Sequence, residues 1–132
     1  MTADELVAVA QKLIRERYHK EGHHTVVAAA LWTKSGKLFT SVNAGTNQPS
    51  IATCAEIIAI GMANNDDPKM EIDTIVAVRD KDAYVISPCG KCREYILDYG
   101  PNAKVVVPAD NQKGYKTVKA TELLPNKYKK RT

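Results

Sequence analysis

The sequence lacks any long apolar run. None of its 132 residues lies in an unbroken apolar stretch close to the roughly 18 residues that a membrane-spanning helix requires. The first twenty residues combine acidic side chains with a 3.6-residue apolar pattern, whereas an export signal has basic residues followed by an apolar core. We therefore expect a cytoplasmic protein with no membrane partner.

Cysteine is also scarce, because the chain contains only Cys54, Cys89 and Cys92. An odd number of cysteines cannot all pair within one chain, and a reducing compartment keeps thiols free. Disulfide bonds are therefore not expected to hold this fold together. The three thiols remain available for other chemistry.

The body of the chain has no excess of charge of one sign. The net charge of +4 comes from 19 basic and 15 acidic residues, and the last six residues alone supply Lys127, Lys129, Lys130 and Arg131. The remainder is close to neutral, and no basic stripe is interleaved with aromatic residues. We expect no nucleic-acid partner and interpret the basic tail as a solvated segment.

Length and 44% apolar content fit a single domain spanning residues 1–132. Apolar spacing predicts helices at about 3–19, 52–65 and 91–100, with Thr2 or Asp4 as the first cap. Strands are predicted at 25–32, 37–42, 72–80, 83–88 and 103–108, and a weaker strand at 115–119 precedes a turn or short helix at 121–125. The strands at 72–80 and 83–88 are apolar enough to be covered on both faces. Helices that alternate with apolar strands predict a layered α/β sandwich.

Both cysteine segments open a predicted helix: "TCAE" at 53–56 and "SPCGKC" at 87–92. The start of a helix carries partial positive charge and free N–H groups, which stabilise thiolates. Three thiolates suit zinc best among the common cellular metals. With no fourth cysteine, and with all three histidines near residue 20, one coordination position stays open for a water that zinc would activate.

Glu56 follows the metal-binding Cys54 by two residues. At the start of a helix it can face the water on the metal without becoming a ligand, and a carboxylate there can carry protons. A Cys-x-Glu segment followed by Pro-Cys-x-x-Cys is the pattern of zinc deaminases. The sequence therefore predicts a catalytic zinc site.

With these two segments the chain resembles the cytidine deaminase superfamily, in the free-nucleoside branch that binds zinc through three cysteines and includes the tetrameric cytidine deaminases and the blasticidin S deaminases. The resemblance implies a three-layer α/β/α sandwich with a five-stranded mixed sheet. It implies zinc on the three cysteines, Glu56 as the catalytic proton carrier, and a homotetramer. The implied reaction is hydrolytic release of ammonia from an amino-substituted pyrimidine-type nucleoside or related heterocycle.

The resemblance also implies substrate contacts. Asn43 matches an asparagine that contacts the sugar-like part of the substrate, and the backbone carbonyl of Ser87 matches the one that receives the leaving amine. Ala55, between Cys54 and Glu56, joins this substrate-binding set.

The chain departs from the family pattern at the substrate end. Gly45 stands where cytidine deaminases carry a second sugar-binding glutamate, and Thr25, beside His24, stands where they carry a phenylalanine. We therefore predict that cytidine is a poor substrate. The same reasoning predicts that Gly45→Glu raises cytidine turnover, unless Gly45 is required for a positive φ angle.

A further departure concerns charge near the metal. Ile57 replaces the arginine that usually follows Cys-Ala-Glu, so Lys91 or Arg93 is expected to temper the negative charge of the thiolates. Three other interpretations stay open: core cysteines without metal, a structural zinc module for protein interaction that uses a histidine as fourth ligand, and a deaminase of a free modified base.

Overall fold

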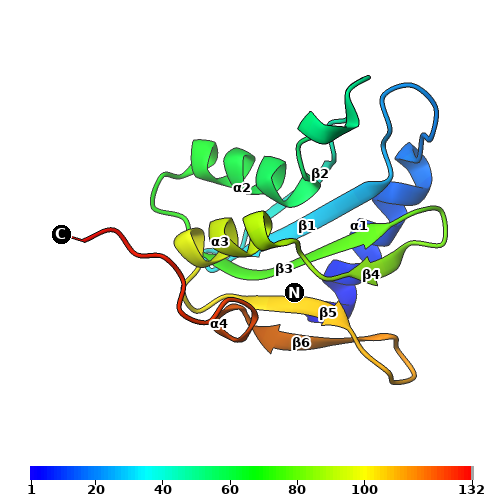
Figure 1. The fold of residues 1–132 in the computed structure, drawn as a ribbon. Helices are drawn as coiled ribbons and strands as arrows, with labels where there is room; N and C mark the ends of the chain where they lie inside the picture. Colours follow the sequence, from blue (N-terminus) through cyan, green and yellow to red (C-terminus); the bar gives the residue numbers. More distant parts are fainter. Residues whose placement is uncertain (132) are drawn as a thin grey trace.

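A computed structural model describes residues 1–131 as three layers around a mixed β-sheet (Figure 1). One face of the sheet is covered by α1 (Ala3–Arg17). The opposite face carries α2 (Ala55–Asp66), α3 (Gly90–Tyr99) and the short α4 (Ala120–Leu123). The predicted α/β/α sandwich is therefore confirmed.

Five strands form a continuous sheet in the order β2-β1-β3-β5-β6. Their bounds are β1 Val27–Thr33, β2 Leu38–Val42, β3 Ile72–Arg79, β5 Lys104–Pro108 and β6 Tyr115–Lys119. Only the β3–β5 pairing is parallel, so the sheet is mixed. A sixth short strand, β4 (Tyr84–Ile86), pairs with the end of β3. The expectation that this segment is covered on both faces is wrong, because Tyr84 is 47% exposed.

The cap of helix α1 explains why the helix begins at residue 3. Thr2 Oγ1 accepts a hydrogen bond from the Glu5 backbone N–H, and Glu5 Oε1 accepts one from the Thr2 backbone N–H, at 3.1 and 3.3 Å. This capping box satisfies two otherwise unpaired donors. The apolar face of α1 is fully buried against the sheet, and the helix ends at Arg17, two residues before the predicted end.

Strand alternation divides the core in two. On β3, Val76 and Val78 pack toward α1, whereas Ile75 packs toward α2 and α3. Successive side chains of a strand point to opposite faces, so Ala77 and the last residue, Arg79, lie on the α2/α3 face. That face carries the candidate site described below.

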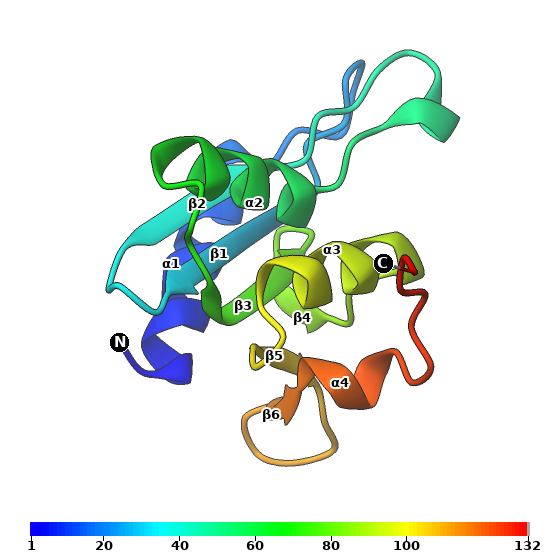
Figure 2. The same cartoon turned by 90° about the vertical axis from the view of Figure 1, so that its left-hand side faces the viewer.

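Two loops project together from one end of the sheet (Figure 2). Residues 19–25 are closed by a bridge between His19 and Thr25, and residues 44–53 by a bridge between Ala44 and Thr53. The hairpin between β1 and β2 turns at Gly36, whose φ of 89° suits glycine. Within residues 1–131, no helix combines the length and apolar character needed to cross a bilayer.

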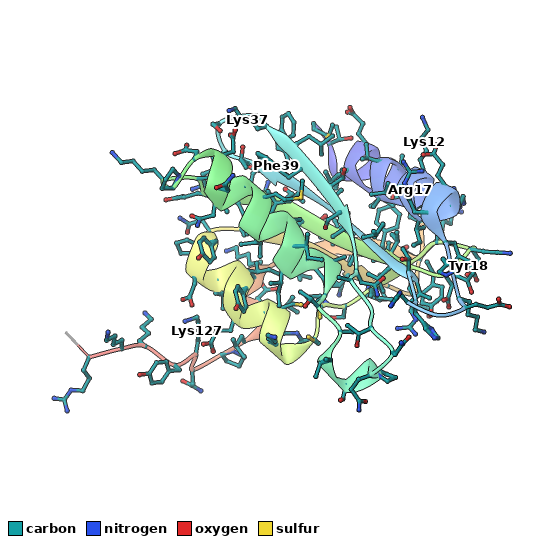
Figure 3. All side chains as sticks on the ribbon, turned by 90° about the horizontal axis from the view of Figure 1, so that it is seen from above. Lys12, Arg17, Tyr18, Lys37, Phe39 and Lys127 are labelled. Atoms are coloured by element: carbon teal, nitrogen blue, oxygen red, sulfur yellow. The ribbon has the colours of Figure 1, made fainter. Side chains whose placement is uncertain are left out.

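The C-terminal segment leaves α4 and passes along α3, where Figure 3 places Lys127. Lys127 Nζ lies 2.7 Å from Asp98 Oδ1 on α3, and the lysine side chain is only 14% exposed. The expectation of a wholly solvated basic tail is therefore wrong at Lys127. Lys129, Lys130 and Arg131 are exposed, as expected.

Candidate active site

The three cysteines meet where two helices begin. Cys54 is the N-cap of α2, Cys89 is the N-cap of α3, and Cys92 lies in the first turn of α3. Their three sulfur atoms all lie within 4.8 Å of one another, close enough to bind one metal ion. The structure thus brings together all of the predicted ligands, and a set of three thiols is the donor set that zinc prefers.

The thiols differ in how easily they ionise. Burial opposes ionisation of Cys89, but the N–H groups of Cys92 and Lys91 and the neighbouring thiols outweigh it and lower its pKa. Burial raises the pKa values of Cys54 and Cys92. A bound cation opposes the effect of burial, because it stabilises every thiolate that ligates it. The start of α3 therefore favours the first thiolate, and metal binding favours the others.

Glu56 is the second residue of α2 and is only 4% exposed. Burial raises the pKa of its carboxyl group, against the opposing effect of its own backbone N–H and of the Cys92 thiol beside it. The structure therefore places the predicted proton carrier next to the cysteine cluster. The carboxylate oxygens of Glu56 are not part of the cluster of atoms that could bind the metal.

Ser41 is a supporting residue that the sequence does not reveal. Its hydroxyl is buried and donates a 2.5 Å hydrogen bond to the Ala55 carbonyl, which joins β2 to the first turn of α2. This contact fixes the backbone between Cys54 and Glu56. A single serine in a strand carries no signal of that role, because its partner lies on another element, fourteen positions later in the chain.

Asn43, predicted to contact the sugar-like part of a substrate, is engaged with the protein backbone. Its Oδ1 accepts hydrogen bonds from the N–H groups of Val26 and Val27 at 2.9 and 3.0 Å. Its Nδ2 donates to the His24 carbonyl at 2.8 Å. One N–H of the amide remains for a ligand. Asn43 therefore joins the end of β2 to the segment that leads into β1.

Gly45 lies against the same segment. A Cβ atom at this position would lie 3.0 Å from the His24 nitrogen and 2.8 Å from the His24 carbonyl oxygen, and the second distance is closer than such atoms approach. The φ angle of Gly45 is not positive, so the positive-φ alternative is wrong and close backbone approach is the reason for glycine. The same close approach opposes the predicted gain from Gly45→Glu, because a side chain at residue 45 requires the His24 backbone to move.

Arg93 braces the segment that precedes Cys89. Its Nε donates to the Pro88 carbonyl at 2.8 Å, and its Nη2 donates to Ser87 Oγ at 3.0 Å. Its Nη1 donates to the Leu123 carbonyl at the end of α4, also at 3.0 Å. The guanidinium thus adds positive charge beside the metal-binding segment while it holds that segment in place. Lys91, the other residue expected to temper the charge, is exposed.

A cavity of about 590 Å³ opens beside the cysteines. It is bounded by α2, by the ends of β1, β3 and β4, and by the two projecting loops. Its lining residues are His24, Val26, Val27, Asn43, Gly45, Thr46, Pro49, Ala52, Thr53, Cys54, Ala55, Glu56, Arg79, Ile86, Ser87 and Cys89. All of the predicted substrate-binding residues therefore face one space, together with Glu56 and two of the cysteines.

Comparisons with known proteins agree with this geometry. The family described as the cytidine and deoxycytidylate deaminase zinc-binding region matches residues 1–109. The blasticidin-S deaminase of Bacillus cereus is 41% identical, over 94% of this chain and 90% of that protein. The cytidine deaminase of Sporosarcina psychrophila is 29% identical, over 98% and 93%. The crystal structure of cytidine deaminase from Burkholderia pseudomallei matches with a TM-score of 0.79 and 30% identity, over 97% and 100%.

The chain therefore belongs to the cytidine and deoxycytidylate deaminase family, as its two cysteine segments predicted. It is a zinc-dependent hydrolytic deaminase, and zinc is the metal that its cysteine cluster fits.

Proposed function

We propose that residues 1–132 form one catalytic domain that hydrolyses an exocyclic amine from a pyrimidine-type nucleoside or a related heterocycle. The observation that carries this proposal is the meeting of three sulfur atoms within 4.8 Å, beside a buried glutamate, in a cavity of about 590 Å³. Cys54, Cys89 and Cys92 hold the zinc. When bound, zinc activates a water molecule as a nucleophile near neutral pH.

Glu56 carries the protons of the reaction. Water adds its oxygen to the ring carbon that bears the amine, and Glu56 accepts the proton that water gives up. Glu56 delivers this first proton to the ring nitrogen. It then carries the second proton, from the hydroxyl group now on the ring carbon, to the amine. The carbon–nitrogen bond breaks, and ammonia leaves while the ring carbon keeps a carbonyl. The burial of Glu56 supports this role, because a raised pKa suits a group that must both accept and donate.

The backbone around the cysteines positions the substrate. The carbonyl of Ser87 receives the departing amine, and Arg93 keeps that segment in register through Pro88 and the Ser87 hydroxyl. Ala55 contacts the ring from the start of α2, where Ser41 fixes its carbonyl. Asn43 offers its remaining N–H to the sugar-like part.

The interpretation as a structural zinc module has less support. A structural zinc site is normally closed by four protein ligands. In the part of the chain that the structure describes, no histidine or acidic residue joins the three cysteines. The open cavity beside the cluster instead suits a substrate.

The substrate is tested by following ammonia release from the zinc-loaded protein over a panel. The panel contains cytidine, deoxycytidine, blasticidin S, and the free bases cytosine and 5-methylcytosine, since relatives are named for both kinds of nucleoside-like substrate. Turnover of at least one nucleoside-like member, abolished in Glu56→Gln, is the expected result. Turnover of free bases alone would favour the modified-base alternative, and no turnover of any member would reject the proposed function.

The proposed assembly is a homotetramer, and the proposed compartment is the cytoplasm, where zinc-binding thiols stay reduced. Large apolar side chains remain exposed on the chain, including Ile51 at 65% and Met62 at 46%. In the proposed assembly, partner subunits would cover such side chains. Light scattering coupled to gel filtration gives the assembly directly, and a monomer at micromolar concentration would contradict it.

A further inference from the structure

Arg79 occupies a position in the cavity that the mechanism does not use. It is the last residue of β3, opposite Val27 on β1 and Tyr84 on β4. Strand alternation places it on the same face of the sheet as α2 and α3, and it lines the cavity with Glu56 and Cys89. A charged side chain here ends a strand whose preceding five residues are buried.

Two residues of opposite charge line the cavity. Among the lining residues, Glu56 is the only carboxylate and Arg79 is the only residue with a permanent positive charge. Glu56 belongs to the metal end. The rest of the cavity therefore presents the positive charge of Arg79. Gly45 contributes no side chain there, and no second acidic residue among those that line the cavity opposes the arginine.

The guanidinium of Arg79 is also free to bind. Among residues 1–131 its only charged contact is a loose one, 3.8 Å from its Nε to Asp80 Oδ1, with the two side chains 49% and 39% exposed. Asp80 in turn accepts a hydrogen bond from the Tyr84 hydroxyl at 3.3 Å. Arg93, by contrast, uses its guanidinium in three hydrogen bonds of 2.8 to 3.0 Å. Arg93 is therefore structural, whereas Arg79 has N–H donors available.

We infer that Arg79 recognises an anionic group, a carboxylate or a phosphate, on the sugar-like part of the substrate. The inference rests on the proposed function, because the ring must lie at the zinc end for its substituent to reach Arg79. The planar guanidinium matches both oxyanions through paired N–H donors. A neutral nucleoside leaves these donors to water, so the cavity discriminates by the charge of the sugar-like part.

The test compares three substrates that share one ring: cytidine, cytidine 5′-monophosphate, and cytidine carrying a 5′-carboxylate. The readout is the ratio of kcat/KM for each anionic substrate to that for cytidine. We expect a ratio above one in the zinc-loaded protein, and Arg79→Gln to lower it by roughly 10- to 150-fold, the effect of one charge-assisted hydrogen bond. Arg79→Lys should restore part of the ratio. The carboxylate and phosphate arms show which oxyanion is preferred.

Lys81→Gln is the matched control, because it removes one exposed positive charge from the same turn and leaves the cavity lining intact. Its ratio should equal that of the unmodified protein. An equal fall in Lys81→Gln and Arg79→Gln would show a general charge effect, and an unchanged ratio in Arg79→Gln would show that the arginine is only a surface residue. Either result overturns the inference.

Binding measured by calorimetry on zinc-loaded Glu56→Gln separates this inference from the proposed function. Tighter binding of cytidine 5′-monophosphate than of cytidine, lost in the double variant with Arg79→Gln, supports anion recognition even if no ammonia is ever released. Ammonia release with no dependence of binding or ratio on Arg79 supports the deaminase and rejects the role of Arg79.

Discussion

The two ends of the cavity are built from different parts of the fold. At the metal end, Cys54, Glu56 and Cys92 lie on the first turns of two helices that pack on the sheet, and Glu56 and Cys92 are buried. At the open end, Asn43 and Gly45 lie where β2 gives way to loops, against the backbone of His24. Packed helices fix the chemistry, and loop contacts fix the space in which a substrate sits. Changes at the first end should therefore remove function outright, and changes at the second should alter stability and selectivity.

The largest expected effect comes from Cys89→Ala. Metal ligation can contribute on the order of 10 kcal/mol to folding where the site forms only in the folded chain, so loss of one of three ligands should remove the zinc and lower the melting temperature strongly. Elemental analysis and thermal unfolding measure both. Ser50→Ala, on the exposed loop near the cavity, is the control and should keep its metal. A Cys89→Ala protein with full zinc content and unchanged Tm would show that this thiol is not a ligand.

Glu56→Gln should separate chemistry from structure at the metal end. The amide keeps the size of the side chain and removes the proton carrier, so kcat should fall by roughly 10² to 10⁴. Zinc content should stay that of the unmodified protein, and stability should not fall, because a neutral side chain is easier to bury than a charged one. A variant that retains near-normal kcat would refute the assigned role.

The contrast between the metal end and the open end also explains which features could be predicted from the sequence. Cys89 and Cys92 lie within one helical turn, and Cys54 and Glu56 within another, so local spacing alone brings each pair to one place. The helices and strands were predictable because their apolar periodicity is strong. The shortest strand departed in its burial, since Tyr84 is exposed where burial was expected.

The open end could not be predicted in this way. The reason for Gly45 is the backbone of His24, twenty-one positions earlier, and no local pattern encodes a contact between two loops. The same holds for Ser41, whose partner is the Ala55 carbonyl. In the sequence, Arg79 is simply the end of an apolar strand, and its place in the cavity emerges only when β1, β3 and β4 are side by side.

At the open end, Asn43→Ala should have the larger effect on stability. It removes one acceptor that serves two backbone N–H groups and one donor to the His24 carbonyl. Leaving these groups unpaired should lower the free energy of unfolding by about 2 to 4 kcal/mol, given about 1 to 3 kcal/mol for each buried group and partial exposure here. Chemical denaturation measures the change.

Asn43→Asp sharpens this test, because it keeps the acceptor and removes the donor. It should be less destabilising than Asn43→Ala and should still impair turnover if the remaining N–H binds substrate. If both variants keep the stability of the unmodified protein and lose only activity, Asn43 serves the substrate alone and the bonds to Val26, Val27 and His24 contribute little.

The smallest effect, and the one that reverses the expectation from sequence, concerns Gly45. An added Cβ would lie 2.8 Å from the His24 carbonyl oxygen, so Gly45→Ala forces the two loops apart and should lower the free energy of unfolding by about 1 to 3 kcal/mol. Gly61→Ala is the matched control, because its Cβ meets nothing within 4 Å on helix α2, and alanine there should stabilise by about 0.5 to 1 kcal/mol.

Gly45→Glu should be at least as unstable as Gly45→Ala and should not raise cytidine turnover, since a separated loop no longer presents Asn43 to the cavity. Higher cytidine turnover in Gly45→Glu at an unchanged melting temperature would mean that the segment at His24 moves aside without loss, and that the open end is set by side chains and not by the close packing of two loops.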